Sequence, residues 1–138
     1  MILVIRIVGD VEIRNDVKET MFRMGIRRKY SAVLMEDNET THHILDKVRN
    51  FVAYGPISKE MISELITKRG QKLAGKKTDV AGAIAGVEKK DLREFGLKPF
   101  FRLHPPRGGI DSKIHFGKKK GVLGDNKEKI NDLLRRML

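Results

Sequence analysis

The stretch ILVIRIV at residues 2–8 decides the fold, because it reads as a largely buried β-strand. It is rich in β-branched residues, and Arg6 alone interrupts its apolar run. The chain then alternates a helix, a strand near 32–35, a second helix and a third strand at 51–54. The sequence therefore predicts an α/β (α+β) protein with a β-α-β-α-β core at residues 1–55. By itself this alternation favours parallel pairing of the strands.

Local signals predict where these elements begin and end. A capping box at residues 16–19 (DVKE) is expected to open the first helix, and Gly25 to end it. Thr40 or Thr41 is the expected cap of the second helix. The Gly-Pro dipeptide at 55–56 is expected to stop the third strand.

The remaining residues, 56–138, read as an extension that completes a single domain of residues 1–138. We first expect a helix capped by Ser58 and ended by Gly70, then a basic linker at 71–78 and one or two short helices at 80–95. A strand at 99–103 and a basic glycine-rich arm at 104–124 are expected next. The chain then closes with a C-terminal helix opened by a capping box at 125–128. The strand at 99–103 is suited to the edge of the sheet, because proline is tolerated at a first strand position. The glycines of the arm predict an open and flexible backbone.

Length and composition exclude several classes of protein. The chain has 138 residues, which fits one domain, and 40% of them are hydrophobic, which is compatible with a packed core. It contains no cysteine, so disulfides, thiolate nucleophiles and cysteine-ligated metals are excluded. No apolar run approaches the ~18 residues of a membrane helix, and none reads as a signal peptide. We therefore expect a soluble cytoplasmic protein with no membrane partner.

Other sites for metals, cofactors or catalysis have little support. His42 and His43 lie beside acidic residues, but adjacent helical residues point about 100° apart and share one ion poorly. No phosphate-cradling glycine-rich loop is present. Arg14-Asn15 imitates only part of the site of a small phosphate-hydrolysing enzyme, which is an alternative function. The sequence thus predicts no metal, no cofactor, no small-molecule substrate and no enzymatic activity.

The positive charge is concentrated in a few segments. The chain carries a net charge of +11, from 29 basic and 18 acidic residues. About half of the basic residues lie at 27–29, 68–77 and 102–121, which together contain a single acidic residue. An ordinary lysine-rich surface is the alternative, but such a surface mixes the two signs. This segregation favours the binding of a polyanion.

The segment at 104–121 is the most informative of the three. Its glycines let the backbone approach phosphates, its cations neutralise them, and its two prolines limit the entropy lost on docking. Only 6% of residues are aromatic, which favours recognition of backbone and shape over the reading of single-stranded bases. The candidate RNA-binding residues are Arg27, Arg28, Lys29, Lys68, Arg69, Lys72, Lys76, Lys77, Arg102, His104, Arg107, Gly108, Gly109, Lys113, His115, Lys118, Lys119 and Lys120.

Several segments resemble one known family in their order along the chain. They are IRIVG at 5–9, GIRRKY at 25–30, VRNFVAYG at 48–55, KRG at 68–70, FRLHPPRGG at 101–109 and INDLLRRML at 130–138. Together they are similar to the ribosomal protein L-thirty family of the large subunit, in its archaeal and eukaryotic branch (L-seven in eukaryotes). The HPPRGG stretch is the most specific of them, and the resemblance covers nearly the whole chain.

The resemblance implies a fold and a partner. It implies a core related to the ferredoxin-like arrangement, with a mainly antiparallel sheet and a central first strand. It also implies a structural constituent of the large ribosomal subunit that has no catalytic residues and lies in the cytoplasm. Its expected partners are large-subunit ribosomal RNA, in a position near 5S RNA, and neighbouring ribosomal proteins.

The sequence alone leaves open two questions: how mobile the arm is, and which nucleic acids the protein binds. Because no apolar periodicity anchors residues 104–121, we expect them to be mobile in the free protein and ordered on RNA. A general RNA- or DNA-binding module or chaperone outside the ribosome is the main alternative function. Selectivity for ribosomal RNA over unrelated duplex would distinguish the two.

Overall fold

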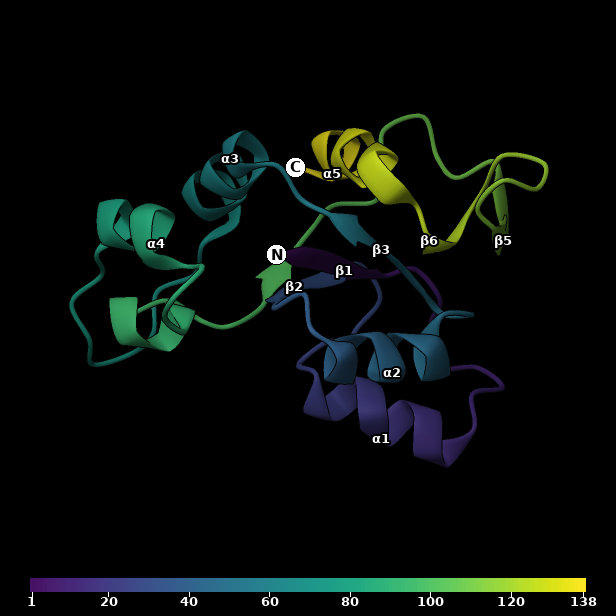
Figure 1. Cartoon of the computed structure of the whole chain (residues 1–138), viewed down its shortest axis with the longest axis horizontal. Helices are drawn as coiled ribbons and strands as arrows, with labels where there is room; N and C mark the ends of the chain where they lie inside the picture. The colour runs from purple at the N-terminus through teal and green to yellow at the C-terminus, as the bar shows by residue number, and fades with distance from the viewer.

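The computed structural model describes all 138 residues as a six-stranded sheet with helices on both faces (Figure 1). The strands are β1 (Ile2–Arg6), β2 (Ser31–Met35), β3 (Val52–Pro56), β4 (Phe101–Arg102), β5 (Ser112–His115) and β6 (Gly121–Asp125). The α-helices are α1 (Asn15–Arg23), α2 (Glu39–Val48), α3 (Lys59–Arg69), α4 (Val80–Gly86) and α5 (Ile130–Met137), with 3-10 turns η1 (Leu92–Phe95) and η2 (Lys127–Lys129). The predicted α+β class is confirmed. None of these helices has both the length and the apolar character that crossing a bilayer requires.

The sheet has the order β4-β2-β1-β3-β6-β5, with β1 antiparallel to both of its neighbours. The central antiparallel first strand implied by the family resemblance is therefore confirmed, and the parallel pairing suggested by the alternation of elements is wrong. The reason lies in the path of the chain after β1. The amide of Tyr30 donates to the carbonyl of Arg6 at 2.7 Å, so α1 returns the chain to the end of β1 that it left. From that point β2 can only run in the opposite direction.

Strand β1 is buried on both faces, which explains its nearly continuous apolar sequence. Leu3 and Ile5 belong to a core of 20 buried residues that includes the inner sides of α3 and α5. Ile2 and Val4 belong to a second core of 9 buried residues, formed with α1 and α2. Figure 1 shows these two pairs of helices on opposite sides of the sheet. Burial of each such side chain contributes about 1.5–3 kcal/mol, so β1 is the strand around which both layers assemble.

The charge of Arg6 suggests a break in the buried strand, but the structure shows none at this residue. Its side chain is 1% exposed. The guanidinium donates to the carbonyls of Val8 at 2.9 Å, Ile26 at 3.2 Å and Arg27 at 2.5 Å, and it forms an ion pair with Asp10 at 2.7 Å. A buried charge is tolerated when hydrogen bonds replace its water in this way. Arg6 is therefore part of the strand, but it is the last residue of β1, so the predicted continuation to residue 8 is wrong.

The starts of α1 and α2 differ from the sequence expectation. The N-cap position of α1 is Arg14, which makes no side-chain cap, and Asp16 lies inside the first turn, where its charge favours the helix dipole. For α2 the cap is neither threonine but Asn38, whose side-chain oxygen accepts a hydrogen bond from the Thr41 amide at 2.8 Å. Asparagine is the stronger cap, so this helix starts earlier than the threonines suggested.

Of the two other predicted helix starts, that of α3 is confirmed and that of α5 is wrong. Ser58 caps α3 as predicted, and Gly70 occupies its C-cap. The capping box at 125–128 does not open α5. Asp125, the last residue of β6, instead accepts a hydrogen bond from the Lys127 amide at 2.9 Å just before η2, and α5 starts at Ile130.

The Gly-Pro dipeptide does not stop β3, because both residues belong to the strand. Gly55 lies opposite Leu3, and Pro56 lies opposite Ile2 at the last position of β3, where proline is tolerated. A Cβ atom on Gly55 would lie 2.5 Å from the carbonyl oxygen of Lys127. Glycine is therefore required here because η2 packs directly against the strand.

We expected the arm at 104–124 to be open throughout. This prediction is wrong, because the arm contains β5 and β6. Strand β6 pairs in parallel with β3, where Gly124 lies opposite Ala53, and β5 pairs with β6 at the edge. Residues 104–109 lack regular structure, as predicted. The strands escaped prediction because their glycines and charges hide any alternation of polar and apolar residues.

Helix α1 ends in a motif that only glycine fits well. Gly25 has φ +89°, its amide donates to the Phe22 carbonyl, and the amide of Ile26 donates to the Met21 carbonyl. We expect Gly25→Ala to lower the free energy of unfolding by about 1 kcal/mol, because alanine is strained at positive φ. Gly9→Ala is the matched control, because a Cβ atom added at either glycine would meet nothing within 4 Å and Gly9 has no positive φ. Urea denaturation that gives equal losses for both variants would contradict this account.

Candidate nucleic-acid interface

A groove lined by cations lies between the end of α1, the turn that follows it, and the strand segment at 98–102. It is open to solvent and has a volume of about 850 Å³. Six basic side chains and no acidic side chain line it: Arg23, Arg27, Arg28, Arg93, Lys98 and Arg102. Two aromatic side chains, Phe22 and Phe100, lie among them. We call this surface the basic groove. Its charge is suited to a polyanion.

Buried Arg6 fixes the turn that carries Arg27 and Arg28 into the basic groove. Its guanidinium holds the carbonyls of Ile26 and Arg27 from below, while its own carbonyl accepts from the Tyr30 amide. The hydrogen bond and the positive charge of Arg6 lower the pKa of Asp10 below its ordinary value, so this pair stays ionised. The backbone of the turn therefore faces the core, and its cationic side chains are left exposed.

The segment at 98–102 supplies two more of these cations, Lys98 and Arg102. Lys98, Phe100 and Arg102 line the basic groove, whereas Phe101 is fully buried beneath it and pairs with Ala32 of β2. Successive residues of an extended segment point to opposite faces. The buried phenylalanine thus anchors the segment, and the residues on either side of it are held at the surface.

The basic linker at 71–78 lies beside the groove. The amide of Leu73 donates to the Gly96 carbonyl at 2.8 Å, and the amide of Lys98 donates to the Gln71 carbonyl at 2.9 Å. These bonds tie the linker to the segment at 93–98. The linker carries the exposed cations Lys72, Lys76 and Lys77.

Two further candidates, Lys68 and Arg69, have partners within the protein. Lys68 pairs with Glu64 at 3.2 Å, one turn earlier on α3. Arg69 is half-buried and donates to the backbone oxygen of Leu138 at 3.0 Å, while its Nε is buried without a partner. Arg69 therefore joins α3 to the end of α5, in addition to any contact it makes with a ligand.

The HPPRGG loop is held against the last turn of α5. The amide of His104 donates to the Met137 carbonyl, and the amide of Arg107 donates to the Arg136 carbonyl, both at 3.0 Å. The Arg136 guanidinium donates in return to the carbonyls of Arg107 and Gly109. The loop thereby satisfies carbonyls that a helix end leaves unpaired. The side chains of His104 and Arg107 and both glycines, Gly108 and Gly109, remain exposed.

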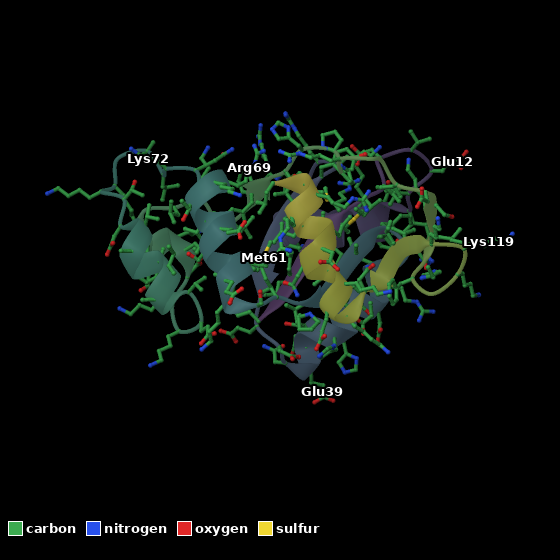
Figure 2. The ribbon with its side chains drawn as sticks, turned by 90° about the horizontal axis from the view of Figure 1, so that it is seen from above. Glu12, Glu39, Met61, Arg69, Lys72 and Lys119 are labelled. Atoms are coloured by element: carbon green, nitrogen blue, oxygen red, sulfur yellow. The ribbon has the colours of Figure 1, made fainter.

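The remaining candidates lie on β5 and on the segment that joins it to β6. We call residues 113–120 the arm tip; its exposed polar side chains are Lys113, His115, Lys118, Lys119 and Lys120. Figure 2 shows Lys119 and Lys72 at opposite ends of the molecule, with Glu39 on the edge away from Arg69. The predicted residues therefore form no single patch. The basic groove lies at the β4 edge of the sheet, and the arm tip lies at the opposite edge, formed by β5.

The residues considered for a metal site and for a phosphate-hydrolysing site lie apart from these surfaces. His42 Nε2 lies 2.6 Å from an oxygen of Asp37, whereas His43 lies 3.8 Å from Glu39, so the two rings have different partners. No group of three metal-ligating side chains occurs in the chain. Arg14 pairs with Asp16 at 3.2 Å on the surface of α1.

Several residues of the basic groove were missed by sequence reasoning. Arg23, Arg93 and Lys98 lie outside the charged segments, and the aromatic Phe22 and Phe100 gave no signal of their own. The alternation of Lys98, Phe100 and Arg102 is the one local pattern that indicates a shared face. The other residues come together only through the tertiary fold.

Comparisons with known proteins agree with this architecture. No protein-family model matches the chain. The large ribosomal subunit protein uL30 of Methanococcus vannielii is 36% identical over 155 aligned positions, which cover 98% of this chain and 97% of that protein. The uL30 proteins of Methanobrevibacter smithii and Nanoarchaeum equitans are each 32% identical, over 100% and 98% of this chain respectively. The resemblance read from the sequence is thus confirmed, and the chain belongs to the uL30 family of large ribosomal subunit proteins.

Proposed function

We propose that this protein is a structural, non-enzymatic constituent of the large ribosomal subunit that binds ribosomal RNA through the basic groove and the arm tip. The observation that carries the proposal is the groove itself, which is lined by six basic side chains from separate parts of the chain, only one of which, Arg23, is paired with an acid, Glu19 at 2.6 Å. The uL30 relatives, which span nearly the whole chain, support the ribosomal assignment. The same relatives favour this role over that of a small phosphate-hydrolysing enzyme.

The mechanism is charge neutralisation combined with fixed geometry. Each phosphate contact releases condensed counterions, which drives binding without any chemical step. Arg28 and Arg102 each present a planar fork that matches phosphate oxygens, whereas Lys118–Lys120 act as point charges. Because these surfaces lie at opposite edges of the sheet, one protein ties two separate stretches of RNA together. This bridging supports assembly of the subunit and, through it, translation.

We further propose that residues 1–138 act as one domain. Strands from the extension add to both edges of the β1–β3 sheet, and the 20-residue core contains both Leu3 and Met137. The basic groove and the arm tip are then held at a set separation. A position near 5S RNA, beside other ribosomal proteins of a cytoplasmic particle, rests on the family resemblance, and nuclease footprinting of 5S RNA in assembled subunits tests it.

Reversal of two groove charges tests the proposed function. We expect Arg27→Glu with Arg28→Glu to weaken binding to large-subunit ribosomal RNA at least tenfold and to reduce the slope of log K against log salt by about 2. Both side chains are exposed, so folding is unaffected. The measurement is filter binding of the full chain across a salt series. Lys18→Glu with Arg49→Glu makes the same change in charge on exposed positions of α1 and of the end of α2, and it should bind as the unmodified protein does.

An equal loss in both double variants would mean that only net charge matters, which would contradict the assignment to the groove. Competition with an equal mass of unrelated duplex distinguishes the ribosomal role from a general nucleic-acid module. We expect the duplex to displace little of the bound ribosomal RNA. Full displacement would favour the general module.

A further inference from the structure

Two aromatic side chains in the basic groove are not explained by neutralisation of phosphates. Phe22 is 52% exposed and is the only aromatic residue among the exposed large apolar side chains. It lies on the last turn of α1, next to buried Met21 but outside the core. An aromatic ring left in water on a cationic surface indicates a partner with an apolar face.

A cationic side chain of the protein itself already lies over the ring of Phe22. The guanidinium carbon of Arg27 lies 3.7 Å from its centroid, which places the charged group in close stacking contact with the ring. Arginine planes and aromatic rings are the side chains on which unpaired bases stack. Phe22 and Arg27 together form such a platform, and the turn held by Arg6 keeps Arg27 in place.

A second aromatic side chain enters the same groove from the strand segment. Phe100 is half-buried between Lys98 and Arg102, whose charged groups lie 6.0 and 5.9 Å from its centroid. The buried side chain of Phe101, the next residue, anchors the backbone from which this ring projects. The groove therefore offers two aromatic platforms, each with cations beside it to take the flanking phosphates.

We infer that the basic groove binds unpaired nucleotides of the RNA, whose bases stack on Phe22–Arg27 and on Phe100. This inference rests on the proposed function and names the form of RNA that the groove takes. A regular duplex hides the faces of its bases and presents only phosphates and groove edges, so it would leave both rings without a partner. The volume of about 850 Å³ lies within the range of pockets that enclose small organic ligands, about 300–1,000 Å³.

Photo-crosslinking tests the inference directly, because irradiation at short wavelength joins stacked rings without a linker. The full chain is bound to large-subunit ribosomal RNA, irradiated and digested, and the adducts are mapped by mass spectrometry. We expect adducts at Phe22 and at Phe100, on nucleotides whose base-pairing edges are reactive to chemical probes in the free RNA. Adducts on paired nucleotides only, or no adduct at either phenylalanine, would overturn the inference. In assembled subunits, adducts of these rings with a neighbouring protein would overturn it as well.

Substitution of the two rings provides a second measurement. We expect Phe22→Leu with Phe100→Leu to weaken binding about tenfold while the salt slope stays unchanged, since stacking is lost and phosphate contacts are kept. Phe51→Leu is the matched control, because Phe51 is a half-buried aromatic residue that packs against the second core and lies outside both the basic groove and the arm tip. Thermal unfolding of each variant establishes that it is folded.

The two proposals fail in different ways. If Arg27→Glu with Arg28→Glu weakens binding but the phenylalanine variants bind as the unmodified protein does, the groove reads phosphates alone and the present inference is wrong. If reversal of the groove charges leaves both affinity and salt slope unchanged, the proposed use of the groove is itself wrong.

Discussion

Replacement of Phe101 by alanine is expected to lower the free energy of unfolding by about 3–5 kcal/mol. Phe101 is fully buried and belongs to the core that includes the inner sides of α3 and α5. It also fixes β4 to the edge of β2, where it lies opposite Ala32. The substitution therefore removes a large apolar side chain, leaves a cavity and loosens the strand that presents Arg102. Urea denaturation followed by circular dichroism measures the loss.

The neighbouring residue is the control for this prediction. Phe100→Ala removes the same atoms from a half-buried position at the groove, so its effect on stability should be about 1 kcal/mol or less. Phe100→Ala should act mainly by weakening RNA binding and only slightly by lowering stability. Equal destabilisation by the two alanines would show that β4 is not anchored through Phe101.

Replacement of Arg6 by methionine is expected to lower the free energy of unfolding by about 3 kcal/mol, since each buried carbonyl that loses its donor costs about 1–3 kcal/mol. Methionine fills much of the same volume but donates no hydrogen bond to the carbonyls of Ile26 and Arg27. The turn that carries Arg27 and Arg28 would lose its fixed backbone. RNA binding should therefore weaken as well, although Arg6 itself is buried and touches no solvent.

The same substitution at an exposed arginine separates charge from structure. Arg14 is 82% exposed and makes one surface ion pair, with Asp16. Arg14→Met should change stability by about 0.5 kcal/mol or less. Denaturation curves that coincide for the two methionine variants would show that the hydrogen bonds of Arg6 contribute nothing.

Sequence signals that span only a few neighbouring residues predicted much of the fold. The apolar run of β1, the glycine after α1 and the serine before α3 each lie within a few neighbouring residues, and each is found in the structure. The direction of β2 was missed because it depends on where α1 returns the chain. Burial of Arg6 was missed because two of its partners are carbonyls about 20 residues away, which have no signature in the sequence.

The candidate site was predictable only as far as charge alone can indicate it. Arg27, Arg28 and Arg102 stood out because they lie in segments almost free of acidic residues, and the structure brings all three to one groove. Arg93 and Phe22 were missed because nothing in their own segments marks them, and only the packed chain brings those segments together. Arg69 was selected for its charge, yet it also binds the end of the chain at Leu138.

The two edges of the sheet affect how the protein behaves before it meets its partner. One edge is β4, only two residues long, and the other is β5, whose register is irregular and whose side chains include Lys113 and His115. Short, charged and irregular edge strands are poor templates for a strand from another molecule. We therefore do not expect either edge to pair with the sheet of a second copy before the protein binds RNA.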